Sequence, residues 1–166
     1  ENIINKFYEA SQSGVKIHLI IRGICCLRPG IKGLSENISV TSIIGRFLEH
    51  GRIYVFANGG NFMSEKNLVY MASADLMPRN LFRRVENFIP LENETVREQA
   101  LTQVMYVSLE DNKNKWVLDS KGKYTKVLSN KNKFSSHDYF MKNPSLSGQG
   151  TLAEKAKKTA LQFLKS

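Results

Sequence analysis

The stretch NIINKFYEASQSGVKIHLIIR, residues 2–22, decides the fold class. Its first half places Ile3, Phe7 and Ala10 on one face, which is the spacing of an amphipathic helix, and Gly14 supplies the stop. The run VKIHLIIR that follows is nearly all apolar and rich in branched side chains, as in a strand that is buried on both faces of a sheet. A helix, a glycine and a buried strand in this order predict an α/β fold.

Short strands and turn-rich segments alternate further along the chain. Residues 23–39 hold three glycines and a proline, so we expect a loop there, at the end of the first strand, where α/β folds favour ligand sites. The patterns predict a short helix over residues 43–50 and strands over residues 52–57, 68–73 and 83–91. Asn-Gly adopts positive φ readily, so NGGN is expected to turn the chain between the first two of these strands.

A final core helix is expected before the composition changes. Thr95 and Glu98 have the spacing of a capping box and precede an apolar stripe, which predicts a helix that closes the core near residue 110. Beyond it Lys, Asn, Ser and Asp dominate, as in an exposed appendage. We therefore expect one domain over residues 1–110, with a mixed central sheet flanked by helices, and a basic polar appendage over residues 111–166 with a candidate terminal helix.

The bulk composition narrows the partners without choosing one. A formal net charge of +9 and a pI near 9.6 predict a surface that attracts anions: nucleic acid, anionic lipid, nucleotides or phosphate polymers. The two cysteines are adjacent, so no disulfide framework is expected, in keeping with a reducing cytoplasm. No apolar run approaches the length of a membrane helix. The chain begins without methionine, which suggests a piece of a longer polypeptide.

Arginines gather at the predicted strand ends and in the loops beside them. Guanidinium groups grip phosphate oxygens in a bidentate fashion, so the inferred ligand is a polyanion. Solvated gatekeeper arginines beside buried strands are the alternative for any single one of them. Arg22 favours the functional interpretation, because it ends an apolar run directly before Gly23 and emerges beside a loop.

The remaining candidate groups are less informative. His18 is expected to be a satisfied core or edge histidine, and His137, in the polar tail, is expected to be inert. Cys25 and Cys26 lack the partners of a zinc site and are expected to pack. The sequence contains no Walker-type glycine loop and no dinucleotide fingerprint. His50 is, from its local pattern, as compatible with a helix C-cap as with a catalytic group.

Spacing shifts that balance for His50. His-x-Arg, a strand, a Gly-rich turn and a strand that ends in Ala-Ser-Ala-Asp are similar to the His-x-Lys and Gly-Ser-x-Asn blocks of the phospholipase D superfamily. In that fold two such half-sites meet, one histidine attacks phosphorus and the other acts as acid and base. This chain holds one half-site, so the resemblance implies a phospholipase D-like half.

Two longer blocks carry a more specific resemblance. IIRGICCLRPGIKGLSENISVTSIIGRFLEHGRIYVF, residues 20–56, and VYMASADLMPRNLFRRVE, residues 69–86, resemble the histidine-phosphorylating type of bacterial polyphosphate kinase almost word for word. The resemblance is strong over residues 1–110 and weak beyond. It implies the C-terminal catalytic domain of an enzyme that transfers the terminal phosphate of ATP reversibly to polyphosphate, through a phosphohistidine on an upstream domain. The chain alone is then expected to be an inactive fragment.

The resemblance also assigns residues. It implies that His50 in FLEH is the second active-site histidine and that Arg22 in IIRG grips phosphate, both in contact with ATP; Arg79 in MPRN is a plausible further phosphate contact. Mg²⁺ is an implied cofactor whose ligands belong to the upstream domains, so no metal site is assigned here. ATP or ADP, polyphosphate and the upstream domains are the implied partners, and the implied location is the cytoplasm, with homo-oligomerisation or peripheral membrane association of the full enzyme left open.

Two alternatives remain at this point. Arg52 and Asp75 stand where the phospholipase D relatives carry Lys and Asn, which argues against direct phosphodiester hydrolysis, but a homodimeric phosphodiesterase or nuclease that pairs two copies of His50 is still one alternative. The other is a non-catalytic basic module that binds polyphosphate or nucleic acid with strong salt dependence.

Overall fold

The computed structural model describes residues 1–129 and 133–143, and the chain divides into two compact units. Among the described residues, the first unit comprises 1–49, 110–129 and 133–138, and the second comprises 50–109 and 139–143. Each unit has its own sheet and its own buried apolar cluster. No helix among the described residues is long and apolar enough to cross a membrane.

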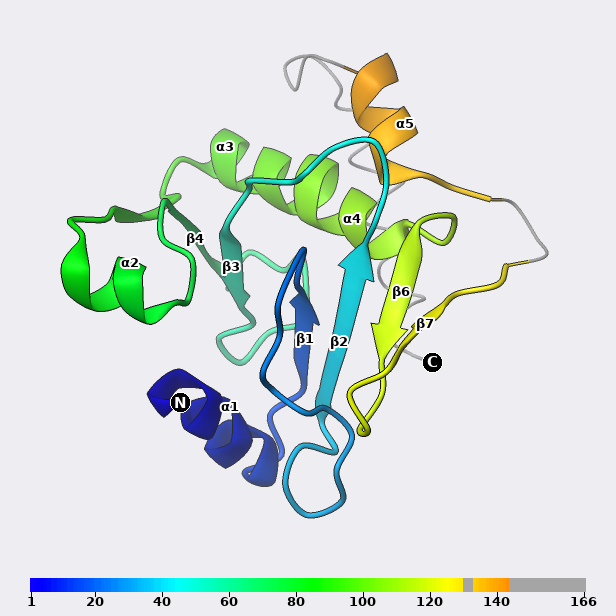
Figure 1. Ribbon diagram of the computed structural model, residues 1–166. Helices are drawn as coiled ribbons and strands as arrows, with labels where there is room; N and C mark the ends of the chain where they lie inside the picture. Colours follow the sequence, from blue (N-terminus) through cyan, green and yellow to red (C-terminus); the bar gives the residue numbers. More distant parts are fainter. Residues whose placement is uncertain (130–132, 144–166) are drawn as a thin grey trace. The chain divides into compact units, whose positions relative to one another are not determined.

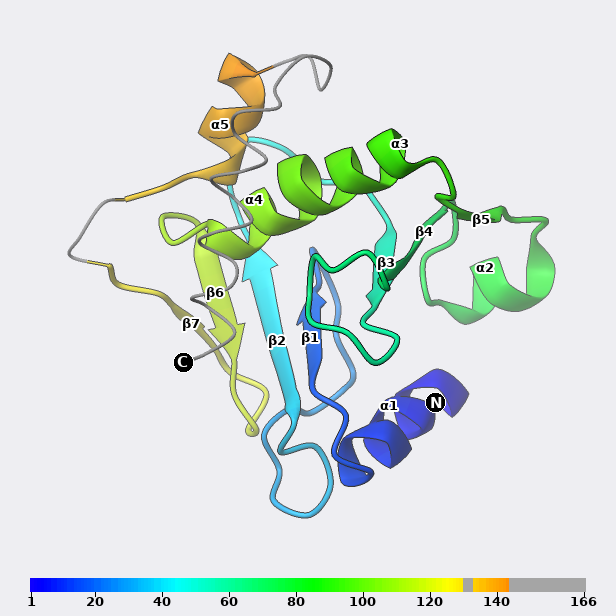
Figure 2. The same cartoon turned by 180° about the vertical axis from the view of Figure 1, so that it is seen from behind.

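The first unit is built on a four-stranded mixed sheet in the order β1-β2-β6-β7 (Figures 1 and 2). Strand β1 pairs with β2 in parallel, whereas β2 with β6 and β6 with β7 are antiparallel. The elements of this unit are α1 (Asn2–Gln12), β1 (Ile17–Ile20), β2 (Ile38–Ile43), β6 (Lys115–Leu118) and β7 (Tyr124–Lys126).

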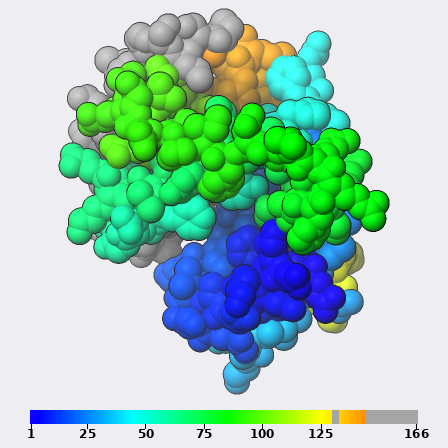
Figure 3. Space-filling view, turned by 90° about the vertical axis from the view of Figure 1, so that its left-hand side faces the viewer, coloured from blue at the N-terminus to red at the C-terminus, as the bar shows by residue number. Residues whose placement is uncertain are grey.

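Apolar residues from distant parts of the sequence form the core of this unit. Leu27, Ile38, Val40 and Leu118 are buried, and α1 packs its apolar side chains, among them Phe7, against them. The opposite face of α1 is polar and lies on the surface, where Figure 3 shows it in dark blue. The amphipathic spacing of residues 2–13 therefore has its expected physical cause, the burial of one helix face.

The second unit is built on a three-stranded antiparallel sheet in the order β3-β4-β5. Val69 in the middle strand is buried against Ala100 and Leu101 of the long helical segment. The strands are β3 (Ile53–Phe56), β4 (Leu68–Ala72) and β5 (Phe88–Pro90); the helices are α2 (Pro78–Arg83), α3 (Glu94–Gln99), the π-helical η1 (Ala100–Met105) and α4 (Tyr106–Glu110), whose last residue belongs to the first unit. Helix α5 (Ser136–Lys142) is divided between the units, with its first three residues in the first unit. The α/β class, with mixed sheet pairing and helices beside the sheets, is confirmed, although the strands are shared between two sheets rather than one central sheet.

Most of the predicted elements are present. The first helix, the first strand and the strands within residues 52–57, 68–73 and 83–91 are confirmed. The predicted turn is also confirmed, since Asn58 and Gly59 have φ of 50° and 75°. The helix near residue 95 forms two residues earlier than its predicted cap, because the side chain of Asn93 accepts the hydrogen bond from the Val96 amide.

The predicted helix over residues 43–50 is wrong. Ile43 ends β2, and the chain from residue 44 to residue 52 contains neither helix nor strand. The β-branched run around Val40 favours a strand, and the parallel partner β1 satisfies its backbone. Strand β1 itself is only partly buried: it forms an edge of the described sheet and leaves His18 exposed, so the expectation of burial on both faces is also wrong.

The expectation of an exposed appendage beyond residue 110 also needs correction. Strand β6 pairs with β2 inside the sheet, and Leu118 belongs to the buried core of the first unit. Asp111 and His137 are almost completely buried as well. The polar composition misled because much of this segment is two short strands and tight turns, in which Asn, Asp and Gly satisfy the backbone. The candidate terminal helix lies outside the described residues.

Candidate functional site

Arg22 follows the last residue of β1 closely and turns its guanidinium group toward the chain before His50. Its Nη1 donates a hydrogen bond of 2.5 Å to the main-chain carbonyl of Glu49. No other hydrogen bond to this guanidinium is found within residues 1–129 and 133–143, and the side chain is partly exposed. One end of the planar fork is therefore fixed, and its other N–H groups remain for an anion.

The segment of residues 45–49, which leads to His50, packs against His137. The buried imidazole accepts a hydrogen bond of 3.2 Å from the Phe47 amide at Nδ1, and the two rings lie 5.1 Å apart. The Nε2 atom is 3.1 Å from Oε1 of Glu49, although the alignment is too poor for a hydrogen bond. Position 45 requires glycine, because the Cβ of any other residue would overlap the imidazole of His137. This segment, which lacks helical hydrogen bonds, is held by side-chain contacts instead.

Arg52, two residues after His50, contacts both Asp75 and the main chain of His50. Its Nε and Nη2 donate hydrogen bonds of 3.0 and 2.9 Å to Oδ1 of Asp75, and its Nη1 donates one of 2.7 Å to the main-chain carbonyl of His50. The His50 side chain is exposed. All three guanidinium nitrogens of Arg52 are thus engaged, so this group positions the backbone of His50 while the imidazole stays accessible.

A carboxylate lies near the end of β4 in the same unit. Glu86 accepts hydrogen bonds from Ser73 Oγ and, at 2.7 Å, from Asn80 Nδ2. These two hydrogen bonds, Ser73 first, hold the pKa of Glu86 below its ordinary value, with Arg84 and Arg52 acting in the same direction. The carboxylate is therefore kept ionised, and the buried Asn80 retains one oxygen without a partner in the described chain.

Comparison with known proteins identifies the family. The family model of the polyphosphate kinase C-terminal domain 2 matches residues 1–137. This chain belongs to that family. The polyphosphate kinase of Erythrobacter litoralis is 54% identical over 153 residues, which are 92% of this chain and 21% of that protein. The polyphosphate kinase of Helicobacter pylori is 50% identical over 140 residues, 84% of this chain and 19% of that protein.

A solved structure supports the same assignment. The crystal structure of polyphosphate kinase from Porphyromonas gingivalis matches with a TM-score of 0.74 at 32% identity, over 98% of this chain and 22% of that chain. The chain therefore spans about a fifth of the length of the polyphosphate kinases that it matches. The resemblance predicted from residues 20–56 and 69–86 is confirmed at the level of the family.

The three residues predicted for the polyphosphate kinase site are found in different settings. Arg22 belongs to the first unit, and His50 and Arg79 belong to the second. The exposed Arg79 lies in α2 and forms no hydrogen bond or ion pair within the described part of the chain. That these residues share one phosphate ligand stays a prediction.

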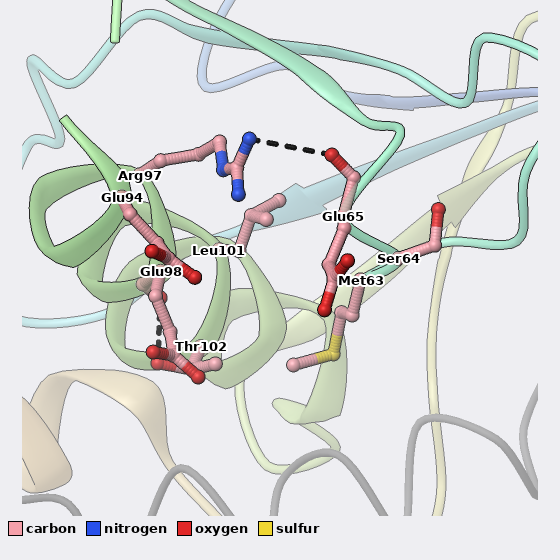
Figure 4. Close-up of a pocket in the computed structure, with 8 residues that line it drawn as sticks. All are labelled: Met63, Ser64, Glu65, Glu94, Arg97, Glu98, Leu101 and Thr102. Atoms are coloured by element: carbon pink, nitrogen blue, oxygen red, sulfur yellow. Dashed lines mark hydrogen bonds between the residues drawn. The ribbon is translucent and has the colours of Figure 1, made fainter. Parts of the chain in front are cut away.

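The pocket shown in Figure 4 does not suit the polyanionic substrate that the polyphosphate kinase family name implies. It is lined by Met63, Ser64, Glu65, Glu94, Arg97, Glu98, Leu101 and Thr102, and so by three carboxylates against one guanidinium. That guanidinium already donates a hydrogen bond of 3.3 Å to the Glu65 carbonyl. Phosphate groups would be repelled here, so this hollow is not a candidate phosphate site.

Metal ligands and two structural groups complete the picture. Within the described ranges, no group of three His, Cys, Asp or Glu side chains could hold a metal ion, and the expectation that Mg²⁺ ligands lie upstream stays a prediction.

Sequence reasoning missed the Ser73–Glu86–Asn80 cluster, which no spacing rule connects, and the burial of His137, whose neighbours in the sequence are polar. His18, by contrast, is satisfied as expected, through the hydroxyl groups of Ser39 and Thr41.

Proposed function

We propose that this chain is the C-terminal catalytic domain of a polyphosphate kinase, which transfers the terminal phosphate of ATP reversibly to polyphosphate through a phosphohistidine on an upstream domain. Membership of the C-terminal domain 2 family, with relatives near 50% identity, is the observation that carries the proposal. The chain covers about a fifth of those relatives, so the proposal assigns it half of an active site, and the upstream domains complete it.

Arg22 is proposed to bind phosphate. In phosphoryl transfer, negative charge is spread over the oxygens of the moving group, and catalysis consists mainly of positioning and of charge stabilisation. A guanidinium group that is fixed at one nitrogen, with its remaining donors unpaired in the described chain, meets both needs. Arg79, exposed in α2, is proposed as a further phosphate contact.

His50 is proposed to hydrogen-bond or protonate the leaving diphosphate or the incoming chain end. Its imidazole is exposed, while its main chain is fixed by Arg52 at its own carbonyl and by Arg22 at the preceding one. An imidazole nitrogen can donate or accept a hydrogen bond and can carry a proton, which suits a group that holds or lends one. The backbone contacts limit the range of positions from which it can do so.

The remaining components of the reaction follow from the same proposal. ATP or ADP and polyphosphate are the substrates, Mg²⁺ is the cofactor with its ligands on the upstream domains, and the enzyme acts in the cytoplasm. The net charge of +9 favours long polyanions by raising their concentration near the surface. An oligomer of the full enzyme is compatible with this scheme.

The test uses the full polypeptide that carries this chain. Arg22→Ala and His50→Ala should each lower the rate of polyphosphate synthesis from ATP at least about 100-fold. For Arg22, the loss of two charge-assisted hydrogen bonds of roughly 1.5–3 kcal/mol each amounts to about 3 kcal/mol or more, and each 1.36 kcal/mol changes a rate tenfold. For His50, a positioned proton donor or acceptor contributes roughly 10²–10⁴-fold. Arg97→Ala and His18→Ala are matched controls outside the proposed site and should stay within about twofold of the parent rate.

Full synthesis in Arg22→Ala or His50→Ala would contradict the assigned roles. Cleavage of DNA or phospholipid by the parent protein, abolished in His50→Ala, would instead favour the phosphodiesterase alternative. Binding of polyphosphate and of DNA with equal affinity, without any turnover, would favour a non-catalytic basic module.

A further inference from the structure

His137 is one of the most completely buried side chains in the described part of the chain, at 1% exposure. A buried polar ring is costly unless its nitrogens find partners. Its one hydrogen bond comes from the segment of residues 45–49, some ninety residues earlier in the sequence, where the Phe47 amide donates to Nδ1; the Glu49 carboxylate lies 3.1 Å from Nε2 without forming a hydrogen bond. The imidazole therefore links the C-terminal part of the first unit to the stretch that leads to His50.

The position of His137 is itself fixed by Asp111. This carboxylate is fully buried and accepts four hydrogen bonds: two from the amides of Lys113 and Asn114, and two from the amide and hydroxyl of Ser136. The residue that precedes His137 is thereby tied to the end of α4. Asp111 and Ser136 belong to the same unit as residues 45–49, so the buried carboxylate and the segment that His137 contacts are parts of one compact body.

The 45–49 segment is shaped to receive this ring. The Ile44 amide donates a hydrogen bond of 3.0 Å to the carbonyl of Asn114, and Gly45 leaves the space that the imidazole occupies. Phe47 lies against the ring at an interplanar angle of 46°. The main-chain carbonyl of Glu49, the last residue of the segment, accepts the hydrogen bond from Arg22. The Glu49 carboxylate lies 3.1 Å from Nε2 of His137.

The segment has few other means of support. Residues 44–52 contain neither helix nor strand, and Phe47 remains 41% exposed although it lies against the imidazole. A stretch without regular hydrogen bonds needs specific side-chain contacts to hold one conformation. Without the imidazole acceptor, the Glu49 carbonyl that Arg22 uses would be held less firmly, and the backbone of His50 would depend on its contact with Arg52.

We propose that His137 is a positioning residue for phosphoryl transfer: through Nδ1 it fixes the 45–49 segment, and thereby the Arg22 anchor and the backbone that carries His50. The proposal rests on the proposed function, since it assigns His137 to the same reaction. His137 need not touch the substrate. Its acceptor atom, rather than its bulk or its charge, carries the role.

Two polar substitutions of His137 test whether Nδ1 or Nε2 of the imidazole carries the role. In His137→Asn the side-chain oxygen can stand where Nδ1 stands and accept from the Phe47 amide, whereas His137→Gln places its polar atoms near Nε2 and leaves that amide without a partner. In the full polypeptide we expect His137→Gln to lower kcat for polyphosphate synthesis about tenfold, with KM for ATP within about twofold, because a misplaced group weakens the transition state. His137→Asn should stay within about threefold of the parent kcat.

A second readout does not depend on activity. Amide hydrogen exchange in the full polypeptide, followed by mass spectrometry on peptides that cover residues 45–49, should be at least about tenfold faster in His137→Gln and close to the parent in His137→Asn. His18→Gln serves as a control for the loss of a histidine that has hydroxyl partners elsewhere and should change neither readout beyond about twofold.

The outcomes are distinguishable. Faster exchange together with lower kcat in His137→Gln, and rescue of both in His137→Asn, would support the proposal. Equal behaviour of the Asn and Gln variants, unchanged exchange in both, or faster exchange with unchanged kcat would overturn it. If the parent polypeptide makes no polyphosphate at all, the proposed function fails first and the catalytic meaning of His137 falls with it, while the exchange data still report whether the segment is held.

Discussion

The ion pair between Arg52 and Asp75 should be among the strongest in the described chain, and a double-mutant cycle can measure it. Two guanidinium nitrogens donate to the same carboxylate oxygen at 3.0 and 2.9 Å. The two side chains are 22% and 26% exposed, so about three-quarters of each is withdrawn from water. Screening by solvent is therefore reduced, although not removed.

The expected size follows from these contacts. Hydrogen bonds to charged groups contribute roughly 1.5–3 kcal/mol net, and exposed ion pairs contribute about 0.2–1 kcal/mol. Because both bonds end on one oxygen and the pair is partly exposed, we expect a coupling free energy of about 1.5 kcal/mol for Arg52 with Asp75. Each single substitution, Arg52→Gln or Asp75→Asn, should destabilise by about 2 kcal/mol, because the remaining partner is left partly buried.

The assay is urea unfolding of the parent, the two single variants and the double variant, followed by far-UV circular dichroism at low and at high salt. Lys6 and Glu9 supply a matched control pair, with a contact of 2.6 Å but side chains that are 76% and 58% exposed. Its coupling should be about 0.3 kcal/mol and should vanish in high salt. A coupling for Arg52 with Asp75 no larger than that of the control pair would refute the reasoning from burial.

Two further predictions concern the second unit. The pKa of Glu86 is lowered from 4.5, so its contribution to stability is present above that pH and is lost as the pH falls through its folded pKa; in Glu86→Gln, thermal unfolding between about pH 3 and pH 5 should depend less on pH, whereas an unchanged dependence would contradict the hydrogen-bonded carboxylate. The Asn93 side chain caps α3 by accepting from the Val96 amide at 3.1 Å, so Asn93→Ala should lower the free energy of unfolding by about 1 kcal/mol, and Asn93→Asp, which keeps the acceptor, should not.

The elements that depend on local pattern were predictable from the sequence. The helix over residues 2–12 is amphipathic and ends near a glycine with φ of +84°, and strands β3 and β4 alternate around a turn whose residues accept positive φ. In each case the physical cause lies within a single short stretch of chain, residues 2–14 for the helix and residues 53–72 for the hairpin. Family membership was equally accessible, because residues 20–56 carry a long and specific pattern.

The predictions that were wrong concern elements whose structure depends on partners distant in the sequence. Strand β2 was read partly as loop and partly as helix because its reason for being a strand is its parallel partner β1 on one side and β6, some seventy residues later, on the other. Segment 111–138 looked like an appendage because its polar residues satisfy one another, with Asp111 as the centre, and composition does not reveal such pairing. The burial of His137 is hidden from the sequence for the same reason.

Arg22 and Arg52 differ in how many of their guanidinium nitrogens already have hydrogen-bond partners. Arg52 has each guanidinium nitrogen satisfied, by Asp75 and by the His50 carbonyl, whereas Arg22 is tied at one nitrogen and otherwise unpaired in the described chain. A guanidinium that is already neutralised by a carboxylate gains little from a phosphate, because the phosphate must compete with the ion pair for the same donors. In this chain Arg52 and Asp75 therefore hold each other and the carbonyl of His50 in place. Arg22 is therefore the arginine proposed to bind phosphate, because its single hydrogen bond to the Glu49 carbonyl orients the guanidinium and leaves its other N–H groups without a partner in the described chain.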